Sequence, residues 1–261
     1  MRLTIYQVDA FSDKPFAGNP AAVCPLESWI DDETMQNIAM ENNLAETAFF
    51  VEKNGMYELR WFTPTVEVDL CGHATLASAF VLFEKLGYSG DTIHFYSPRS
   101  GNLNVSKTGT QYTLDFPTDQ LKEMELTKEL IDCFDLTPKK AVKGLTDYMV
   151  IFDNEEQIRS IEVNLEMLNR LEARGVIITA PGDQVDFVSR FFAPQSGVPE
   201  DPVTGSAHTS LCPYWSKQLE KNKMSAKQLS KRGGEVTVEQ RGDRVNISGQ
   251  AVLTLEGEII F

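Results

Sequence analysis

The strongest constraint on the fold of this chain is an internal repeat. Residues 60–64 read R-W-F-T-P, and residues 190–194, 130 positions later, read R-F-F-A-P. The same shift brings Met35 onto Leu165, each in a helix expected upstream of the repeated strand. In both halves the predicted order is helix, strand, strand ending in F-x-P, loop and helix. A repeat that keeps its offset through several elements indicates a duplicated lobe.

The predicted elements make an α+β chain of two pseudo-symmetric lobes. We assign residues 1–117 to an N-terminal lobe and residues 118–249 to a C-terminal lobe, with a last strand, about 250–261, that returns to the first. Residues 74–86 are apolar on nearly every side, which is typical of a helix buried on all faces. Each lobe is therefore expected to be a curved, mostly antiparallel sheet or barrel around a central helix.

The charge balance argues against nucleic-acid and membrane-surface partners. The 261-residue chain carries 24 basic and 38 acidic residues, a formal net charge of −14, and such a surface repels phosphate backbones and anionic lipids. No apolar run approaches the ~18 residues that a membrane helix needs. The alternating pattern of residues 1–11 predicts a strand and not a signal peptide. We expect a cytoplasmic protein that binds neither nucleic acid nor membrane.

Cysteine and histidine spacing predicts neither a metal site nor a disulfide framework. The four cysteines contain no C-x-x-C pair, and the three histidines show no H-x-x-H spacing. Zinc knuckles and disulfide-rich domains both depend on short, repeated spacings of these residues.

Two loops fall opposite each other under the repeat. The shift of 130 residues brings Cys71 onto Asp201, so the segment 71–73 (C-G-H) corresponds to the start of the segment 201–206 (D-P-V-T-G-S). Both segments are expected to run into a helix, where free backbone N–H groups attract anions without any lysine or arginine. If the lobes face each other, both loops line one cleft, and a small carboxylate is the expected ligand.

The motifs of the chain, taken together, resemble those of one known family. They are G-N-P-A-A-V at 18–23, N-L-A-E-T at 43–47, F-T-P at 62–64, G-H at 72–73 and E-D-P-V-T-G-S-A at 200–207. In this order over most of the chain, they are similar to the motifs of the phenazine biosynthesis PhzF-like isomerases. The resemblance implies a diaminopimelate epimerase-like fold and a homodimer. It also implies an isomerase that moves a proton within a small amino- or hydroxy-carboxylate and uses no cofactor.

The resemblance also implies roles for particular residues. Glu46 would be the general acid and base that shuttles the proton. Asp201 would hold the amine or hydroxyl group of the substrate, and His73 would orient its carboxylate, which completes the implied catalytic set. The implied substrate-binding residues are Asn19, Cys71, Gly72, Gly205 and Ser206. One departure is Ala45, where some members carry serine, and it leaves the identity of the substrate open.

The residues around Glu46 fit this chemistry. A carboxylate takes and returns a proton near neutral pH only if burial or a neighbouring acid raises its pKa. Glu46 lies between Leu44 and the apolar run 48–50, so we expect partial desolvation and a raised pKa. The competing interpretation is a solvated residue at a strand edge. His208, close after the second loop, is expected on a helix surface.

Two other functions stay open from the sequence. Racemases of the same fold use one thiol from each lobe, so Cys71 predicts an amino-acid racemase or epimerase, although its counterpart under the repeat is Asp201. A small packing residue is the plainer interpretation of Cys71. The second alternative is a non-catalytic binding protein on the same scaffold. A serine hydrolase and a nucleotide-binding protein are disfavoured, because the chain has no G-x-S-x-G, P-loop or G-x-G-x-x-G segment.

Overall fold

The computed structural model describes residues 1–261, and the chain folds as two units. The first unit is built from Met1–Asp115 together with Ser248–Phe261, and the second is the continuous stretch Phe116–Ile247. The chain therefore leaves the first unit once and returns to it for its last strand.

The first unit is a mixed sheet with two helices. Its elements are β1 (Arg2–Ala10), β2 (Asn19–Leu26), α1 (Asp32–Asn42), β3 (Glu46–Lys53), β4 (Met56–Phe62), β5 (Glu67–Val68), α2 (Gly72–Glu84), β6 (Thr92–Ser97), β7 (Gly101–Thr108), most of β8 (Gln111–Pro117) and β18 (Ala251–Ile260). β1 is antiparallel to both β2 and β18, and β2 is parallel to β3. β3 is antiparallel to β4, β4 is parallel to β6, and β6, β7 and β8 form an antiparallel meander.

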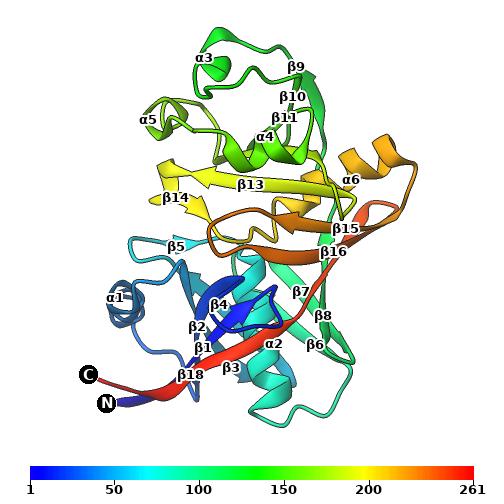
Figure 1. Cartoon of the computed structure of the whole chain (residues 1–261). Helices are drawn as coiled ribbons and strands as arrows, with labels where there is room; N and C mark the ends of the chain where they lie inside the picture. The colour runs from blue at the N-terminus through cyan, green and yellow to red at the C-terminus, as the bar shows by residue number, and fades with distance from the viewer. The chain divides into compact units, whose positions relative to one another are not determined.

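Helix α2 is the buried centre of the first unit (Figure 1). Ten of its 13 residues are buried, and it contacts β1, β2 and β3. Small side chains such as Ala74, Ala77 and Ser78 let these strands approach the helix closely. The expectation of a helix buried on all faces is therefore confirmed. The helix starts at Gly72, two residues earlier than expected, because the backbone N–H of Thr75 already bonds to the carbonyl of residue 71.

The second unit also combines parallel and antiparallel strand pairs with helices. Its elements are β9 (Lys122–Met124), α3 (Lys128–Ile131), β10 (Lys140–Lys143), β11 (Asp147–Ile151), α4 (Glu155–Ser160), α5 (Leu165–Leu168), β12 (Gly175–Pro181), β13 (Phe187–Ala193), a 3₁₀ turn (Pro194–Ser196), β14 (Val198–Asp201), α6 (His208–Leu219), β15 (Lys223–Gln228), β16 (Gly234–Arg241) and most of β17 (Arg244–Gly249). Its core is formed by apolar side chains such as Phe152, Ile178, Val188 and Phe192, with Leu130 and Ile158 from the short helices.

The two units repeat the same order of strand pairing. From β2 through β3, β4 and β6 to β7, successive pairs are parallel, antiparallel, parallel and antiparallel. The pairs from β11 through β12, β13 and β15 to β16 follow the same alternation. The R-x-F-x-P strand is β4 in one unit and β13 in the other, and a helix, α2 or α6, precedes the next long strand. The predicted duplicated α+β fold is confirmed.

The sequence pattern also predicts helices over 165–174 and 207–222, and both are shorter in the structure. The helix expected over 165–174 ends at Leu168, because the backbone N–H of Arg170 bonds to the carbonyl three residues back and the chain then continues in turns. The helix expected over 207–222 runs only over α6 and ends at Glu220, which has a left-handed φ of +54°. No helix is long and apolar enough to cross a membrane.

Candidate active site

A carboxylate, an imidazole and a thiol meet in the first unit. Glu46 is the first residue of β3, and Cys71 and His73 lie at the start of α2. His73 Nε2 is 3.2 Å from Glu46 Oε2, and His73 Nδ1 is 3.4 Å from Cys71 Sγ. Each ring nitrogen of the imidazole is therefore close to one of the other two groups. The Glu46 side chain is 16% exposed and that of His73 5%, so the carboxylate is not a solvated strand-edge group.

The local sequence explains why these groups meet. β2 runs parallel to β3 with Ala21 paired to Glu46, and α2 contacts both strands. Cys71 is the N-cap residue of α2 and has an extended backbone. Its carbonyl oxygen accepts hydrogen bonds from both the backbone N–H and the hydroxyl of Thr75. This first turn carries Cys71 and His73 on one short piece of chain beside the start of β3.

Burial keeps the His73 imidazole neutral. It lowers the pKa of His73 to about 3, since the charged form loses its hydration. Asn19 Nδ2, a hydrogen-bond donor, is 3.1 Å from His73 Nδ1, so Nδ1 accepts and the single ring proton is on Nε2. This N–H lies beside the Glu46 carboxylate, 3.2 Å from Oε2 but without the geometry of a hydrogen bond.

Asn19 reaches His73 because a glycine precedes it. Asn19 is the first residue of β2 and is fully buried. Gly18 has a φ of +66°, and a Cβ at this position would lie 2.2 Å from the carbonyl oxygen of Ala10. Only glycine lets the chain pass so close to the end of β1. The G-N step thus brings Asn19 beside a histidine 54 residues further along the chain.

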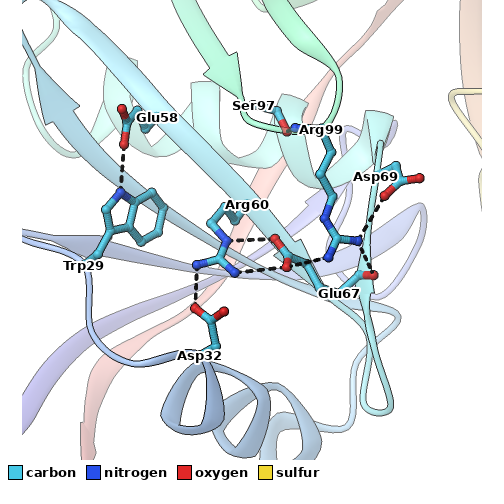
Figure 2. A network of polar contacts seen from close by, with 8 residues as sticks. All are labelled: Trp29, Asp32, Glu58, Arg60, Glu67, Asp69, Ser97 and Arg99. Carbon is cyan, nitrogen blue, oxygen red and sulfur yellow. Dashed lines mark hydrogen bonds and ion pairs between the residues drawn. The ribbon is translucent and has the colours of Figure 1, made fainter.

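An ion-pair network holds the loop between β4 and α2 (Figure 2). Arg60 on β4 makes a bidentate pair with Glu67 on β5, with Nε–Oε1 at 2.7 Å and Nη2–Oε2 at 2.9 Å. Arg99 donates to the same Glu67 carboxylate at 3.0 Å and to Asp69 at 3.0 Å. The segment that leads from β5 into α2 is therefore tied to two arginines from neighbouring strands and turns.

In the second unit, Asp201 is the centre of a closed group of hydrogen bonds. Asp201 is the last residue of β14 and is buried. Thr204 Oγ1 donates to its carboxylate, and Gln228 Nε2 donates to its carbonyl oxygen at 2.7 Å. Gln228 Oε1 in turn accepts from the Thr204 backbone N–H at 2.8 Å. The turn after β14 is closed by these bonds, which hold the Asp201 carboxylate in place.

The arginine pair of the first unit is repeated in the second. Arg190 Nε is 2.7 Å from Glu200 Oε1, and Arg190 Nη2 is 3.1 Å from Glu200 Oε2. Arg60 and Arg190 each lie over the phenylalanine two residues later on the same strand, with 5.2 Å and 5.0 Å from the guanidinium carbon to the ring centroid. We call each set an arginine clamp: Arg60 with Glu67, and Arg190 with Glu200. Both clamps hold a short strand that leads directly to an expected site residue.

Ser206 contacts an arginine that the sequence interpretation missed. Arg174 Nη1 donates to Ser206 Oγ at 3.1 Å, and Arg174 Nε donates to Asp147 at 2.8 Å. Because Oγ already accepts this bond, the Ser206 hydroxyl has its own proton to donate elsewhere. A basic side chain therefore lies beside this loop. Arg174 is 32 residues away in sequence, and no motif marks it.

The comparison with protein families gives a single assignment. The family model for phenazine biosynthesis-like proteins matches residues 8–257. The chain belongs to this family. An uncharacterized isomerase of Pseudomonas aeruginosa is 49% identical over 259 residues, with 99% of each chain covered. The crystal structure of a PhzF-family phenazine biosynthesis protein from Enterococcus faecalis is 46% identical, covers 100% of both chains and superposes with a TM-score of 0.97.

A more distant structure shows how far the fold extends. A probable proline racemase from Agrobacterium radiobacter shares 8% sequence identity, with 99% of this chain and 93% of that one covered and a TM-score of 0.71. At this identity the likeness shows the fold alone, and it is the epimerase-like fold that the resemblance implied. Bacterial relatives of this chain in the phenazine biosynthesis-like family are named isomerases. This protein is therefore an isomerase, and the alternative of a non-catalytic binding protein is set aside.

The expected site residues form two groups, one in each unit. Asn19, Glu46, Cys71 and His73 are joined in the first unit, where Gly72 begins α2. Asp201, Gly205 and Ser206 share one turn in the second unit. Ser206 precedes α6 and does not lie in it, and its carbonyl oxygen accepts from the hydroxyl of Thr209 at 2.7 Å. The catalytic and binding roles of all these residues stay predictions.

His208 is fully buried, so its expected place on the helix surface is wrong. α6 packs on β15 and β16, and its first turn is therefore covered. His208 Nδ1 is 2.9 Å from the carbonyl oxygen of Thr204, which belongs to the turn that holds Asp201. Burial lowers the pKa of His208 to about 4.

Proposed function

We propose that this protein moves a proton between two carbon atoms of a small amino- or hydroxy-carboxylate, with Glu46 as general acid and base and without a cofactor. The observation that supports this most is the 3.2 Å approach of His73 Nε2 to Glu46 Oε2, made by an imidazole that burial keeps neutral. A neutral imidazole beside the carboxylate leaves it without the fixed ion pair that would hold it permanently ionised.

The proposed reaction needs only one group that takes and returns a proton. The Glu46 carboxylate removes a proton from one carbon of the substrate, and the C–H electron pair moves into an adjacent π system. The carboxylic acid so formed exchanges its proton with solvent and then delivers a proton to a second carbon. Substrate and product are isomers, Glu46 ends as a carboxylate, and no oxidant, reductant or leaving group takes part.

The second-unit residues are assigned to substrate recognition in this proposal. The Asp201 carboxylate would accept a hydrogen bond from the amine or hydroxyl group of the substrate. The Ser206 hydroxyl would donate to its carboxylate, because Arg174 already donates to Ser206 Oγ.

The test is solvent deuterium incorporation. The protein is incubated in deuterated water with a panel of small amino- and hydroxy-carboxylates, and mass spectrometry identifies the one that gains label. Glu46→Gln is expected to lower that rate by about 10²- to 10⁴-fold, the usual contribution of a general acid–base group, with the thermal unfolding temperature unchanged. Glu52→Gln, an exposed position on the same strand, is the matched control and keeps the rate. A Glu46→Gln variant of normal activity would refute the assignment.

A second candidate function is favoured by one contact. Cys71 Sγ lies 3.4 Å from His73 Nδ1 at the N-terminus of α2, and the positive end of a helix favours a thiolate. In an amino-acid racemase or epimerase this thiol would remove the α-proton. The same labelling experiment separates the two: label at an α-carbon that is lost in Cys71→Ser and kept in Glu46→Gln supports the racemase, and the reverse pattern supports the Glu46 isomerase.

A further inference from the structure

Three side chains of the first unit offer the donor set of a transition-metal site. Glu46, Cys71 and His73 supply one carboxylate oxygen, one sulfur and one ring nitrogen, and these atoms all lie within 4.8 Å of one another. Cys71 and His73 are almost fully buried and Glu46 is largely so. Three different donors converge from two elements, β3 and the start of α2, which distinguishes this group from the scattered acidic residues of the surface.

The spacing of the donors is close to what a tetrahedral ion requires. Zinc binds sulfur at about 2.3 Å and imidazole nitrogen or carboxylate oxygen at about 2.0–2.2 Å, so its tetrahedral ligands stand roughly 3.3–3.7 Å apart. Glu46 Oε2 is 3.2 Å from His73 Nε2, the nitrogen that would bind the ion. Cys71 Sγ is 3.4 Å from Nδ1, the other nitrogen of the same ring. Because no two of the three donor atoms are more than 4.8 Å apart, side-chain shifts of about 1 Å bring them to the spacing of a tetrahedral ion.

The surroundings of the three donors also suit a metal ion. Cys71 is the N-cap residue of a 13-residue helix, and the positive end of that helix stabilises the thiolate that a metal needs. Asn19 lies on the Nδ1 side of the His73 ring. An amide can donate through nitrogen or accept through oxygen, so Asn19 can hold Nδ1–H while Nε2 binds the ion, as partners of metal-bound histidines commonly do.

We propose that Glu46, Cys71 and His73 bind one soft divalent transition-metal ion, for which Zn²⁺ is the model, and that the bound ion inhibits the isomerase. Sulfur and nitrogen donors select Zn²⁺ and Co²⁺ over Mg²⁺ and Ca²⁺. The thiol releases its proton to solvent when the ion binds. The inhibition rests on the proposed function, because an ion on the Glu46 carboxylate occupies the lone pair that accepts the substrate proton. The binding itself does not rest on it.

The binding half is tested with Co²⁺ as an optical probe. Titration of the full chain is expected to produce a thiolate-to-cobalt charge-transfer band in the near ultraviolet that saturates at one ion per chain and is displaced by Zn²⁺. Cys71→Ser is expected to abolish the band and weaken Zn²⁺ binding at least tenfold. Cys133→Ser, which removes a buried thiol of the second unit, is the matched control and keeps the band. Absence of the band in the wild type, or its persistence in Cys71→Ser, overturns the proposal.

A second variant guards against a folding defect in Cys71→Ser. Asn19→Ala leaves all three donors in place and removes only the partner of the His73 ring. We expect it to weaken Zn²⁺ binding by about 10- to 100-fold, as loss of such a partner usually does, while the charge-transfer band still forms. An unchanged affinity in a folded Asn19→Ala variant contradicts coordination through His73 Nε2.

The inhibition half is measured separately. One equivalent of Zn²⁺ is expected to stop deuterium incorporation, and a chelator restores it. Exchange that continues at full rate with the optical site filled overturns the inhibition and leaves the Glu46 mechanism to be judged by its own variants. A cobalt titration without the band, together with normal Glu46-dependent exchange, overturns the metal site alone.

Discussion

At the scale of the residue, the buried His73 ring lies beside Glu46, the group that changes its protonation state in the proposed reaction. It lies between Asn19 on one nitrogen and Glu46 on the other. When Glu46 is a carboxylate, Nε2–H lies 3.2 Å from it and Nδ1 accepts from the Asn19 amide. When Glu46 is protonated, the ring proton can move to Nδ1 and the Asn19 amide can turn its oxygen toward it, so that Nε2 becomes an acceptor. The same three side chains therefore accommodate both states of a proton shuttle without a charged partner.

A stability prediction at this scale concerns His208. Its folded pKa of about 4 lies below the ordinary value of 6.5, so between these values the unfolded chain binds more protons. Stability therefore rises with pH through this window and falls on acidification, by about 2 kcal/mol at pH 5 for this one group. In urea unfolding at pH 7.5 and 5.0, His208→Gln is expected to lose about 2 kcal/mol less than the wild type. His94→Gln, at an exposed position, should behave like the wild type; an equal loss in both variants would contradict the prediction.

At the scale of the element, the arginine clamps join strands that are too short to be stable alone. β5 has two residues and β14 has four. Each carries or adjoins a glutamate that is paired with an arginine on the longer neighbouring strand, at 2.7 Å in both cases. A bidentate pair fixes direction as well as distance. The clamps thus position the chain just before Cys71 in one unit and at Asp201 in the other.

For the first clamp, we predict that a substitution at a buried carboxylate costs more stability than one at an exposed carboxylate. Glu67 and Arg60 are 15% and 16% exposed, whereas Asp69 is 77% exposed. Glu67→Gln leaves two arginines without their shared carboxylate and is expected to lower the free energy of unfolding by about 1.5–3 kcal/mol. Asp69→Asn removes a solvent-screened contact and should cost only about 0.2–1 kcal/mol. Urea unfolding curves compare the two, and equal costs would show that the clamp adds nothing beyond a surface pair.

At the scale of the whole molecule, the first unit is closed by the last strand of the chain. β1 pairs with β18 antiparallel from Arg2 to Ala10, with one register shift between Gln7 and Val8. About 240 residues of sequence separate the paired segments, so the first unit is complete only when the C-terminus has been made. Pairing segments so far apart in sequence costs loop-closure entropy, and the packing of the complete sheet has to offset this cost.

Truncation tests this dependence. Deletion of residues 251–261 removes β18 and leaves one edge of β1 without its partner. We expect the shortened chain to lose its cooperative unfolding transition in the first unit, seen as loss of near-ultraviolet circular dichroism from the tryptophans, of which Trp61 is fully buried there. Deletion of the exposed residues 260–261 alone is the control and should leave the signal intact. A cooperative transition at the original temperature without β18 would contradict the role of this strand.

Periodicity and motif spacing in the sequence alone determined the α+β class, the duplication and the buried helix α2. Each of these features depends on a short stretch of consecutive residues or on a pattern that repeats at a constant offset, so the sequence alone reveals it. The lengths of α5 and α6 were overestimated because a helical pattern continues beyond the point where turns take over. The sequence motifs also pointed to Glu46 and His73.

Only the tertiary structure decided which side chains meet. The contact of Asn19 with His73 spans 54 residues, and that of Arg174 with Ser206 spans 32. Such contacts depend on strand pairing and on the path of the chain, which no local pattern encodes. Burial, which makes His73 and His208 neutral, is likewise a property of the packed unit. The sequence shows which chemical groups are present. The fold sets the distances between them and their exclusion from water, and these determine what the groups can do.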